Sequence, residues 1–579
     1  MTDMAMTNEL KIVRLGSRLG LAIGLALAAT AAQAQSAPAA GVSYGAPPLS
    51  YGDAGPAPDA ESDQAPDAAP QSPRRRSHAE IHPYLEVAQV VSAELEGGGD
   101  TLTYTSVAAG VDGVIETRRV IVAASYRYQR NFDYDGAVGD EDIHSGVAAV
   151  QLQIVPGVVS FDAGALATRT AGEGRAAGVT SRDGAVEVYS AYAGPTVTAN
   201  AGPVTATAAY RLGYVAIDDD SLAGGPREDF DDAVAHSAMA SVTMAPGRLP
   251  FGVTVSGGWT RTDSDGPFEH EFEGRHVRGE VLVPLGPNFA LTGGVGYEDI
   301  ESSQLDFARD ANGVPLLDAA GRPIPDSNRP RLRTLDLSGT YYDGGFIWRP
   351  SSRTEVQAHA GRRYGGTTVV GSLSHQTSEH AGVTATVFDT VETFSNSLVS
   401  NLSSMPRSFN VNRNVLTGGF GNCVFGSEPG RGACLDSSLQ SVRGESFRAR
   451  GGNLLFSAER GPWSFGIGGS YVHRRYARVP DPVFDALGGS EDDSVSLYGQ
   501  VSRRLSRTSE INFDAYATWY DTNLAGFNEV FSAGGTLTYQ RNLLLDRLEF
   551  LAAIGLYHSN DGALDSTVAQ GLIGLRYTF

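Results

Sequence analysis

The sequence predicts an all-β protein, a transmembrane antiparallel up-and-down β-barrel of about 22 strands, with a range of roughly 18 to 22. Three observations support this fold. From His82 onward, segments alternate apolar and polar residues with a period of two. Short links rich in turn residues alternate with longer acidic or glycine-rich links. After the first 34 residues, no segment approaches the roughly 18 apolar residues that a membrane helix needs, so only a closed barrel would satisfy every backbone group in lipid.

The alternation is clearest in four segments, residues 120–129, 204–214, 355–363 and 511–519. In the first, Val120, Val122 and Tyr126 share one face, and Ser125 and Arg127 share the other. The apolar face suits lipid and the mixed face suits the interior of a barrel. The last strand shows the same pattern and ends in Tyr577 and Phe579 on its apolar side. A closing strand with a terminal aromatic residue resembles the signal that the barrel-assembly machinery reads in bacterial outer membranes.

The links predict the orientation. Bacterial barrels have short periplasmic turns and longer external loops. Ten short links, such as Pro156-Gly157 and Gly461-Pro462, alternate with mostly longer ones, the longest being residues 299–333 and 390–445. We therefore expect an outer-membrane protein of a Gram-negative bacterium with both termini in the periplasm.

The N-terminal residues predict export. Lys11, Arg14 and Arg18 precede an apolar run and the small-residue segment Ala32-Gln33-Ala34, which is the order of a secretory signal peptide over residues 1–34. Residues 35–80 are rich in Ala, Pro and Asp and predict a disordered periplasmic tail, which a periplasmic partner would be able to bind. The barrel is predicted over residues 81–579.

The net charge of −22 indicates which partners to expect. An acidic chain does not attract nucleic acid, whose phosphates need a basic surface. We expect contact with outer-membrane lipids and lipopolysaccharide. Carboxylates gather in the predicted external loops, for example Asp218 to Asp220 and Glu491 to Asp493. They are either a solvated rim or sites where divalent cations bridge to lipopolysaccharide phosphates. No cofactor is predicted otherwise.

The segment Val391 to Arg443 is the strongest candidate for narrowing the pore. A long link without obvious secondary structure is usually functional or disordered. It contains the only two cysteines, Cys423 and Cys434, which we expect to form a disulfide in an exported chain. Such a bond would stabilise the loop by about 2 to 3 kcal/mol in the chain-entropy model. The loop then folds into or over the lumen, or it remains a surface loop.

Charged residues on the inward face of the predicted strands suggest a wall of mixed charge. The candidates are Arg127, Arg211, Glu355, His359, Arg363, Asp514 and Arg576. These side chains either neutralise one another across strands or form a constriction. In a constriction, arginine would favour carboxylates or anionic sugars through bidentate hydrogen bonds.

No set of residues suggests catalysis. The sequence contains neither a phosphate-binding glycine loop nor a nucleophile elbow, and no Ser/His/Asp trio can be nominated. We therefore predict that the protein is not an enzyme.

Several segments resemble a family of large alphaproteobacterial outer-membrane barrel proteins. They include Tyr192-Ala193-Gly194-Pro195, residues 106–112, 140–146 and 210–214, and the run from Asn412 to Phe420. Members often carry the name of the preprotein translocase subunit YajC, although that subunit is short and has one membrane helix. The family is similar to barrels associated with exosortase and exopolysaccharide systems, and this resemblance implies a role in glycan export.

Two functional hypotheses remain from the sequence. The first is a pore for diffusion or export of small solutes or polysaccharide, narrowed by the 391–443 loop. The second is a structural or adhesive surface protein with a blocked lumen. The position of the loop relative to the lumen distinguishes them.

Overall fold

A computed structural model describes most of the chain after residue 76. The described residues are 77–96, 101–134, 141–170, 186–218, 232–247, 249–318, 323–411, 413–419, 423–426, 430–477, 490–523, 529–544, 547–560, 562 and 565–579. The predicted signal peptide and nearly all of the predicted tail lie outside them. None of the described helices has the length and apolar content needed to cross a membrane.

The fold is a closed antiparallel barrel of 22 strands, which confirms the predicted fold class. The wall consists of β1 (His78–Glu96), β2 (Thr101–Glu116), β3 (Val120–Asp133), β4 (Glu141–Val155), β5 (Val159–Thr170), β6 (Val186–Ala201), β7 (Val204–Asp218), β8 (Asp232–Met244), β9 (Gly252–Asp265), β10 (Glu271–Pro284), β11 (Phe289–Gln304), β14 (Leu332–Ser351), β15 (Thr354–Arg363), β16 (Gly366–Ser378), β17 (Ala381–Glu392), β21 (Phe447–Arg460), β22 (Trp463–Tyr476), β23 (Glu491–Arg504), β24 (Ser509–Thr522), β25 (Val530–Leu543), β26 (Leu548–Asn560) and β27 (Asp565–Thr578).

Each wall strand pairs with the next one along the chain, and the first and last strands close the ring. β1 pairs with β27 from Tyr84↔Thr578 to Glu96↔Thr567. The backbone N–H of Phe579 donates to the carbonyl of Pro83 at 3.0 Å, so the carboxyl terminus takes part in the closure. The barrel begins at His78, three residues before the predicted boundary.

The two faces of the wall differ as the alternation predicts for β3 and β24. Arg127 and Asn512 point inward and are buried, whereas Phe513 on the outer face is 46% exposed. Other large apolar side chains stand on the outside, such as Ile554 and Ile573, each 64% exposed. An apolar outer band around a closed ring of strands is the arrangement that a bilayer requires.

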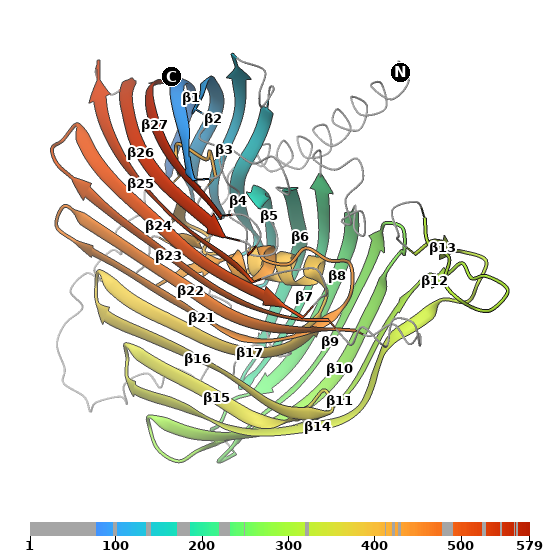
Figure 1. Ribbon diagram of the computed structural model, residues 1–579. Coiled ribbons are helices and arrows are strands. Elements are labelled where there is room, and N and C mark those ends of the chain that lie inside the picture. Colours follow the sequence, from blue (N-terminus) through green and yellow to red (C-terminus); the bar gives the residue numbers. More distant parts are fainter. Residues whose placement is uncertain are drawn as a thin grey trace, which may run out of the picture.

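Two links differ from the expected pattern. β15 and β16 are joined on the long-loop side by Tyr364 and Gly365 alone, with φ values of 52° and 70°. Positive φ at both central residues is typical of a tight hairpin turn. This short link on the long-loop side had no loop-like signal in the sequence. By contrast, β11 and β14 extend beyond their neighbours and carry the short pair β12 (Asp306–Phe307) and β13 (Pro325–Asp326), which projects from the ring in Figure 1.

Candidate functional site in the barrel lumen

The described residues of the segment between β17 and β21, 393–446, lie inside the ring of strands, and we call this segment the lumen plug. It contains α2 (Phe394–Ser403), β18 (Phe409–Asn410), β19 (Cys423–Gly426), β20 (Gly432–Cys434) and α3 (Asp436–Leu439). Figure 1 shows it in orange in the centre of the barrel. It is the segment that the sequence singled out as a candidate for narrowing the pore.

Helix α2 is amphipathic and lies against the wall. Thr393 caps it by accepting a hydrogen bond from the backbone N–H of Asn396 at 3.3 Å. Phe394, Leu398 and Leu402 recur along one face at the spacing of helical turns and are buried, whereas Ser400 and Ser403 on the other side are exposed. The apolar face packs against the inner surface of β5 to β8.

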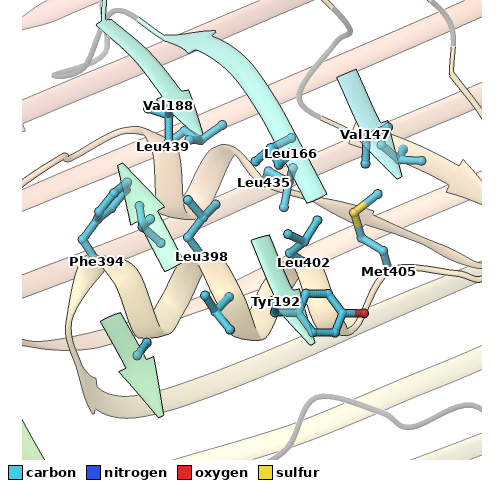
Figure 2. Close-up of a cluster of buried hydrophobic side chains, with 14 of the residues drawn as sticks. Val147, Leu166, Val188, Tyr192, Phe394, Leu398, Leu402, Met405, Leu435 and Leu439 are labelled. Atoms are coloured by element: carbon cyan, nitrogen blue, oxygen red, sulfur yellow. The ribbon is translucent and has the colours of Figure 1, made fainter. Parts of the chain in front are cut away.

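The plug and the wall share one large apolar cluster. Figure 2 shows Leu398 and Leu402 beside Tyr192 of β6, and Leu435 beside Leu166 of β5. Leu439 of α3 lies near Val188, and Met405 lies near Val147. A cluster of this size inside a barrel excludes water, because apolar side chains pack at the density of a protein core. The plug is therefore part of the folded structure and is fixed to one side of the lumen.

Polar anchors hold the middle of the plug. Arg413 donates from Nη1 to Ser145 Oγ at 2.6 Å and from Nη2 to Ser125 Oγ at 2.8 Å. Asn414 Nδ2 donates to Thr536 Oγ1 at 2.7 Å and to Asp514 at 3.1 Å. Both residues belong to the run Asn412 to Phe420, one of the segments with the family resemblance, but no signal in the sequence indicated these partners.

The disulfide lies in the hairpin of β19 and β20. Cys423 and Cys434 are bonded, with their sulfur atoms 2.06 Å apart. A Cβ atom added to Gly468 of β22 would lie 2.4 and 2.5 Å from the two sulfurs, so the wall accommodates the disulfide only because position 468 has no side chain. The sulfurs are thus packed against the wall.

The hairpin reaches deep into the barrel. The N–H of Gly430 donates to Ser457 Oγ at 2.7 Å, and Thr384 Oγ1 donates to the carbonyl of Gly430 at 3.1 Å. Thr384 and Ser457 each lie three residues from the short-turn ends of β17 and β21. Because Thr393 lies at the opposite end of β17, the plug spans most of the height of the lumen.

The predicted lumen residues point inward, and they meet partners across strands. Arg127 and Arg576 both pair with Glu86 of β1, which is 1% exposed, and Arg576 also lies 3.5 Å from Glu549. The remaining pairs are Arg211 with Asp162 at 2.9 Å, Glu355 with Arg349 at 2.8 Å, Arg363 with Glu298 at 2.6 Å, His359 with Asp343 at 3.2 Å, and Asp514 with Asn414. Tyr577 and Phe579 lie on the outer face, with their rings 5.2 Å apart.

One cluster of charges was only partly foreseen. Arg278 of β10 contacts Glu280 at 2.5 Å and Asp343 of β14 at 2.6 Å, and His359 of β15 completes the group. We call these four residues the wall tetrad. The sequence singled out His359 as an inward residue, but no signal indicated that Arg278, Glu280 and Asp343 lie beside it.

Two sets of described residues have the ligand atoms and the spacing for a divalent cation. They are Glu96, His558 and Asp565 at the outer rim, and Glu280, Asp343 and His359 of the wall tetrad. In the tetrad, Arg278 already forms ion pairs with both carboxylates. Of the acidic loop residues, Glu491 and Asp492 pair with Arg475 and Arg474, whereas residues 219–231 lie outside the described part.

The comparisons with known proteins give structural likenesses alone. No family model and no curated sequence matches the chain. The FrpB iron transporter from Neisseria meningitidis (F5-1 variant) is 12% identical, with a TM-score of 0.41 over 86% of this chain and 82% of that one. The ferric-catecholate import receptor Fiu from E. coli K12 in its open form is 10% identical, with a TM-score of 0.40 over 88% and 82%. The siderophore receptor PiuA from Acinetobacter baumannii is 8% identical, with a TM-score of 0.38 over 86% and 82%. At these values no ligand or activity carries over to this chain.

Proposed function

We propose that this protein is an outer-membrane pore whose passage runs beside the lumen plug. One observation carries the proposal. The contacts of the plug run along the wall from β17 through β27 and β1 to β9. On the remaining arc of the wall, several inward side chains of β15 and β16 keep contact with solvent, whereas inward residues of β10, β11 and β14 such as Leu282, Ile300 and Tyr341 are buried. Ser372 and Ser374 of β16 are exposed, and the wall tetrad on β10, β14 and β15 is partly exposed.

The lining of this arc suits small hydrated solutes. Apart from His359, the wall tetrad carries one positive and two negative charges, so the local field favours cations weakly. Ser372, Ser374 and Gln376 of β16 add hydrogen-bonding groups. Polysaccharide export, which the family resemblance implies, would use the same polar arc.

The outer membrane is the location that fits this architecture. A closed barrel with an apolar outer band satisfies its backbone hydrogen bonds without water. Barrels of this size in bacteria occur in the outer membrane.

Single-channel recording tests the proposal. The purified barrel is inserted into planar bilayers, and its conductance is compared with that of a variant in which residues 395–445 are replaced by a short Gly/Ser linker. We expect a steady small conductance for the intact chain and a several-fold larger one for the variant, because barrels of this width leave a wide channel when no plug is present.

A structural or adhesive surface protein is the alternative. The water-excluding packing of the plug favours it, because a permanent plug would also suit a blocked lumen. This alternative would replace the pore if the intact chain, shown to be folded by circular dichroism, gave no conductance in the bilayer. Conductance would then appear only after removal of the plug.

A further inference from the structure

The barrel wall contains a seam between β16 and β17 that backbone hydrogen bonds do not close. The ladder between β16 and β17 runs from Ser378↔Ala381 to Gly371↔Val387 and ends there. Gly366 to Val370 of β16 continue to pair with β15, and Phe388 to Glu392 of β17 continue to pair with β21. The outer portions of β16 and β17 therefore separate. At this seam each strand presents an edge without a ladder partner.

The neighbouring strand does not cover this gap. β15 ends at Arg363, so its ladder with β14 begins only at Tyr342↔Arg362. Beyond that point, Leu332 to Tyr341 of β14 pair with β11 alone. Beyond the Tyr364-Gly365 turn, on the long-loop side, β14 and β17 thus face each other with no strand between them.

Apolar side chains pack across the seam. Phe272, Ile300, Tyr364 and Val391 form a separate buried apolar cluster, against which Leu335 and Leu337 of β14 pack. Tyr364 comes from the turn itself and Val391 from β17. The wall at this height is held by apolar contacts between strands that are not hydrogen-bonded neighbours.

Two arginines donate hydrogen bonds to backbone carbonyls at the open edge of the β15–β16 hairpin. Arg448 Nη1 donates to the carbonyl of Tyr364 at 3.1 Å, and Arg450 Nη2 donates to the carbonyl of Thr367 at 3.1 Å. Both arginines come from β21 and reach across β17. On the way they pair with Asp389, at 2.8 and 3.3 Å. The seam therefore carries two positive charges against one buried carboxylate, and Arg450 is 48% exposed.

The seam begins beside an outward tyrosine. Val387, where the β16–β17 ladder ends, is in register with Gly452 of β21, and Gly452 is in register with Tyr471 of β22. Tyrosine and tryptophan on the outer face of a membrane barrel mark the boundary between hydrocarbon and head groups.

We propose that this seam is a lateral portal, through which an amphiphile with one alkyl chain and an anionic head group passes between the outer leaflet and the lumen. The apolar cluster around Tyr364 receives the chain, and Arg448 and Arg450 receive the head group. Opening the wall here replaces side-chain contacts only, whereas separating any fully paired strands would expose a row of unsatisfied backbone groups. The portal does not depend on the axial passage proposed above.

A pair of engineered cysteines tests the portal. Thr368 and Thr390 would be partners if the β16–β17 ladder continued, so Thr368→Cys with Thr390→Cys allows the seam to be bridged by a bifunctional thiol reagent after folding. Ser372→Cys with Thr386→Cys is the matched control, because those residues are already ladder partners on the same inner face. The native Cys423 and Cys434 are bonded to each other and remain unreactive.

The probe is dodecyl phosphate with a photoreactive diazirine at the end of its chain, added to barrels in phosphatidylcholine vesicles. In the unbridged protein we expect labelling of peptides that contain Leu335, Tyr364 or Val391. Bridging positions 368 and 390 should abolish this labelling. Bridging the control pair should leave it unchanged. Labelling that is equal in all three states, or confined to the outer face of β26, would overturn the proposal.

A second comparison tests the role of the head group and does not depend on the bridge. Arg450→Gln should reduce labelling by dodecyl phosphate but not by the diazirine of neutral dodecanol. Equal labelling by the two probes in both proteins would remove the arginines from the proposal and refute its anionic specificity. Labelling is measured without ion flow, so a failure here is distinct from a failure of the pore.

Discussion

Arg127 and Glu86 form a two-armed ion pair inside the wall, with both nitrogen–oxygen distances at 2.8 Å and with the side chains 2% and 1% exposed. Glu86 lies on β1 and Arg127 on β3, so the pair crosses β2. Arg576 of β27 binds the same carboxylate at 2.9 Å. One carboxylate thus connects the third strand to the last strand across the point where the barrel closes.

Glu86→Gln should destabilise the barrel markedly. Removing one member of a buried ion pair leaves the other charge uncompensated and costs roughly 3 to 5 kcal/mol. Here the substitution leaves two guanidinium groups facing each other. The free energy of unfolding in urea, measured in detergent or vesicles, would show the loss. Asp142→Asn is the control, because its pair with Arg130 at 3.4 Å is exposed and should contribute about 0 to 1 kcal/mol. Equal losses in the two variants would contradict the role of Glu86 in closure.

Asp343→Asn should shift the ion selectivity of the pore toward anions. In the wall tetrad, Arg278 faces Glu280 and Asp343, so removal of one carboxylate changes the local charge from negative to neutral. The reversal potential in a salt gradient measures this change. Asp493→Asn serves as the control, because Asp493 binds Tyr471 and His473 on the outer face. An unchanged reversal potential in Asp343→Asn, with normal conductance, would place the passage elsewhere in the lumen.

The sequence predicted the architecture more completely than the lumen. Period-two alternation and turn residues are local signals, and they were sufficient for the strand number and for the faces of β3 and β24. They also identified the 391–443 segment, because its length and its cysteines are visible without a partner. Helix α2 was not recognised, since its apolar residues are few and its wall partners Leu166 and Tyr192 lie far away in sequence.

The partners of the lumen charges depend on which strands are two or three positions apart around the ring. Arg127 was identified as inward, but Glu86 was not, because the offset between β1 and β3 is fixed by the ladders of β2. The Tyr364-Gly365 turn was missed for a different reason. It lies on the side where the other links are mostly long. It consists of two residues only, so it has no acidic or glycine-rich stretch that would mark it as a loop.

Gly468→Ala should displace the plug hairpin from the wall. The added methyl group would lie within 2.5 Å of both sulfurs of the disulfide, too close for van der Waals contact, so the hairpin has to move. We expect faster hydrogen exchange in residues 423–434 and a larger or noisier conductance. Gly499→Ala on β23 is the matched control, because its Cβ would meet no atom within 4 Å.

Reduction of the disulfide should act differently from this substitution. The apolar cluster and Arg413 hold the plug without the sulfur bond, so conductance should stay nearly constant while the plug becomes less stable by about 2 to 3 kcal/mol. A large conductance increase on reduction alone would show that the disulfide, rather than the apolar cluster, fixes the plug.

Acidification should loosen the link between β9 and β10. His270 lies in the link between these strands, is 8% exposed, and accepts hydrogen bonds from Ser264 through its backbone carbonyl. Burial and the nearby positive charge of Arg331 lower the pKa of His270 to about 4, from its usual value of about 6.5. The folded state therefore keeps this imidazole neutral while the unfolded state takes up a proton below pH 6.5.

The sign of the effect follows from this difference in protonation. The stability of the link is fully present above pH 6.5 and falls as the pH drops toward 4, by on the order of 3 kcal/mol in total. Hydrogen exchange of residues 264–271, corrected for the intrinsic pH dependence of exchange, should report the loss. His270→Asn lacks the titrating group and should show a flat profile in the same window. If the stability of the link falls equally in the wild type and in His270→Asn, the acid sensitivity belongs to other groups. The carboxylates that pair with Arg331 are then the next candidates.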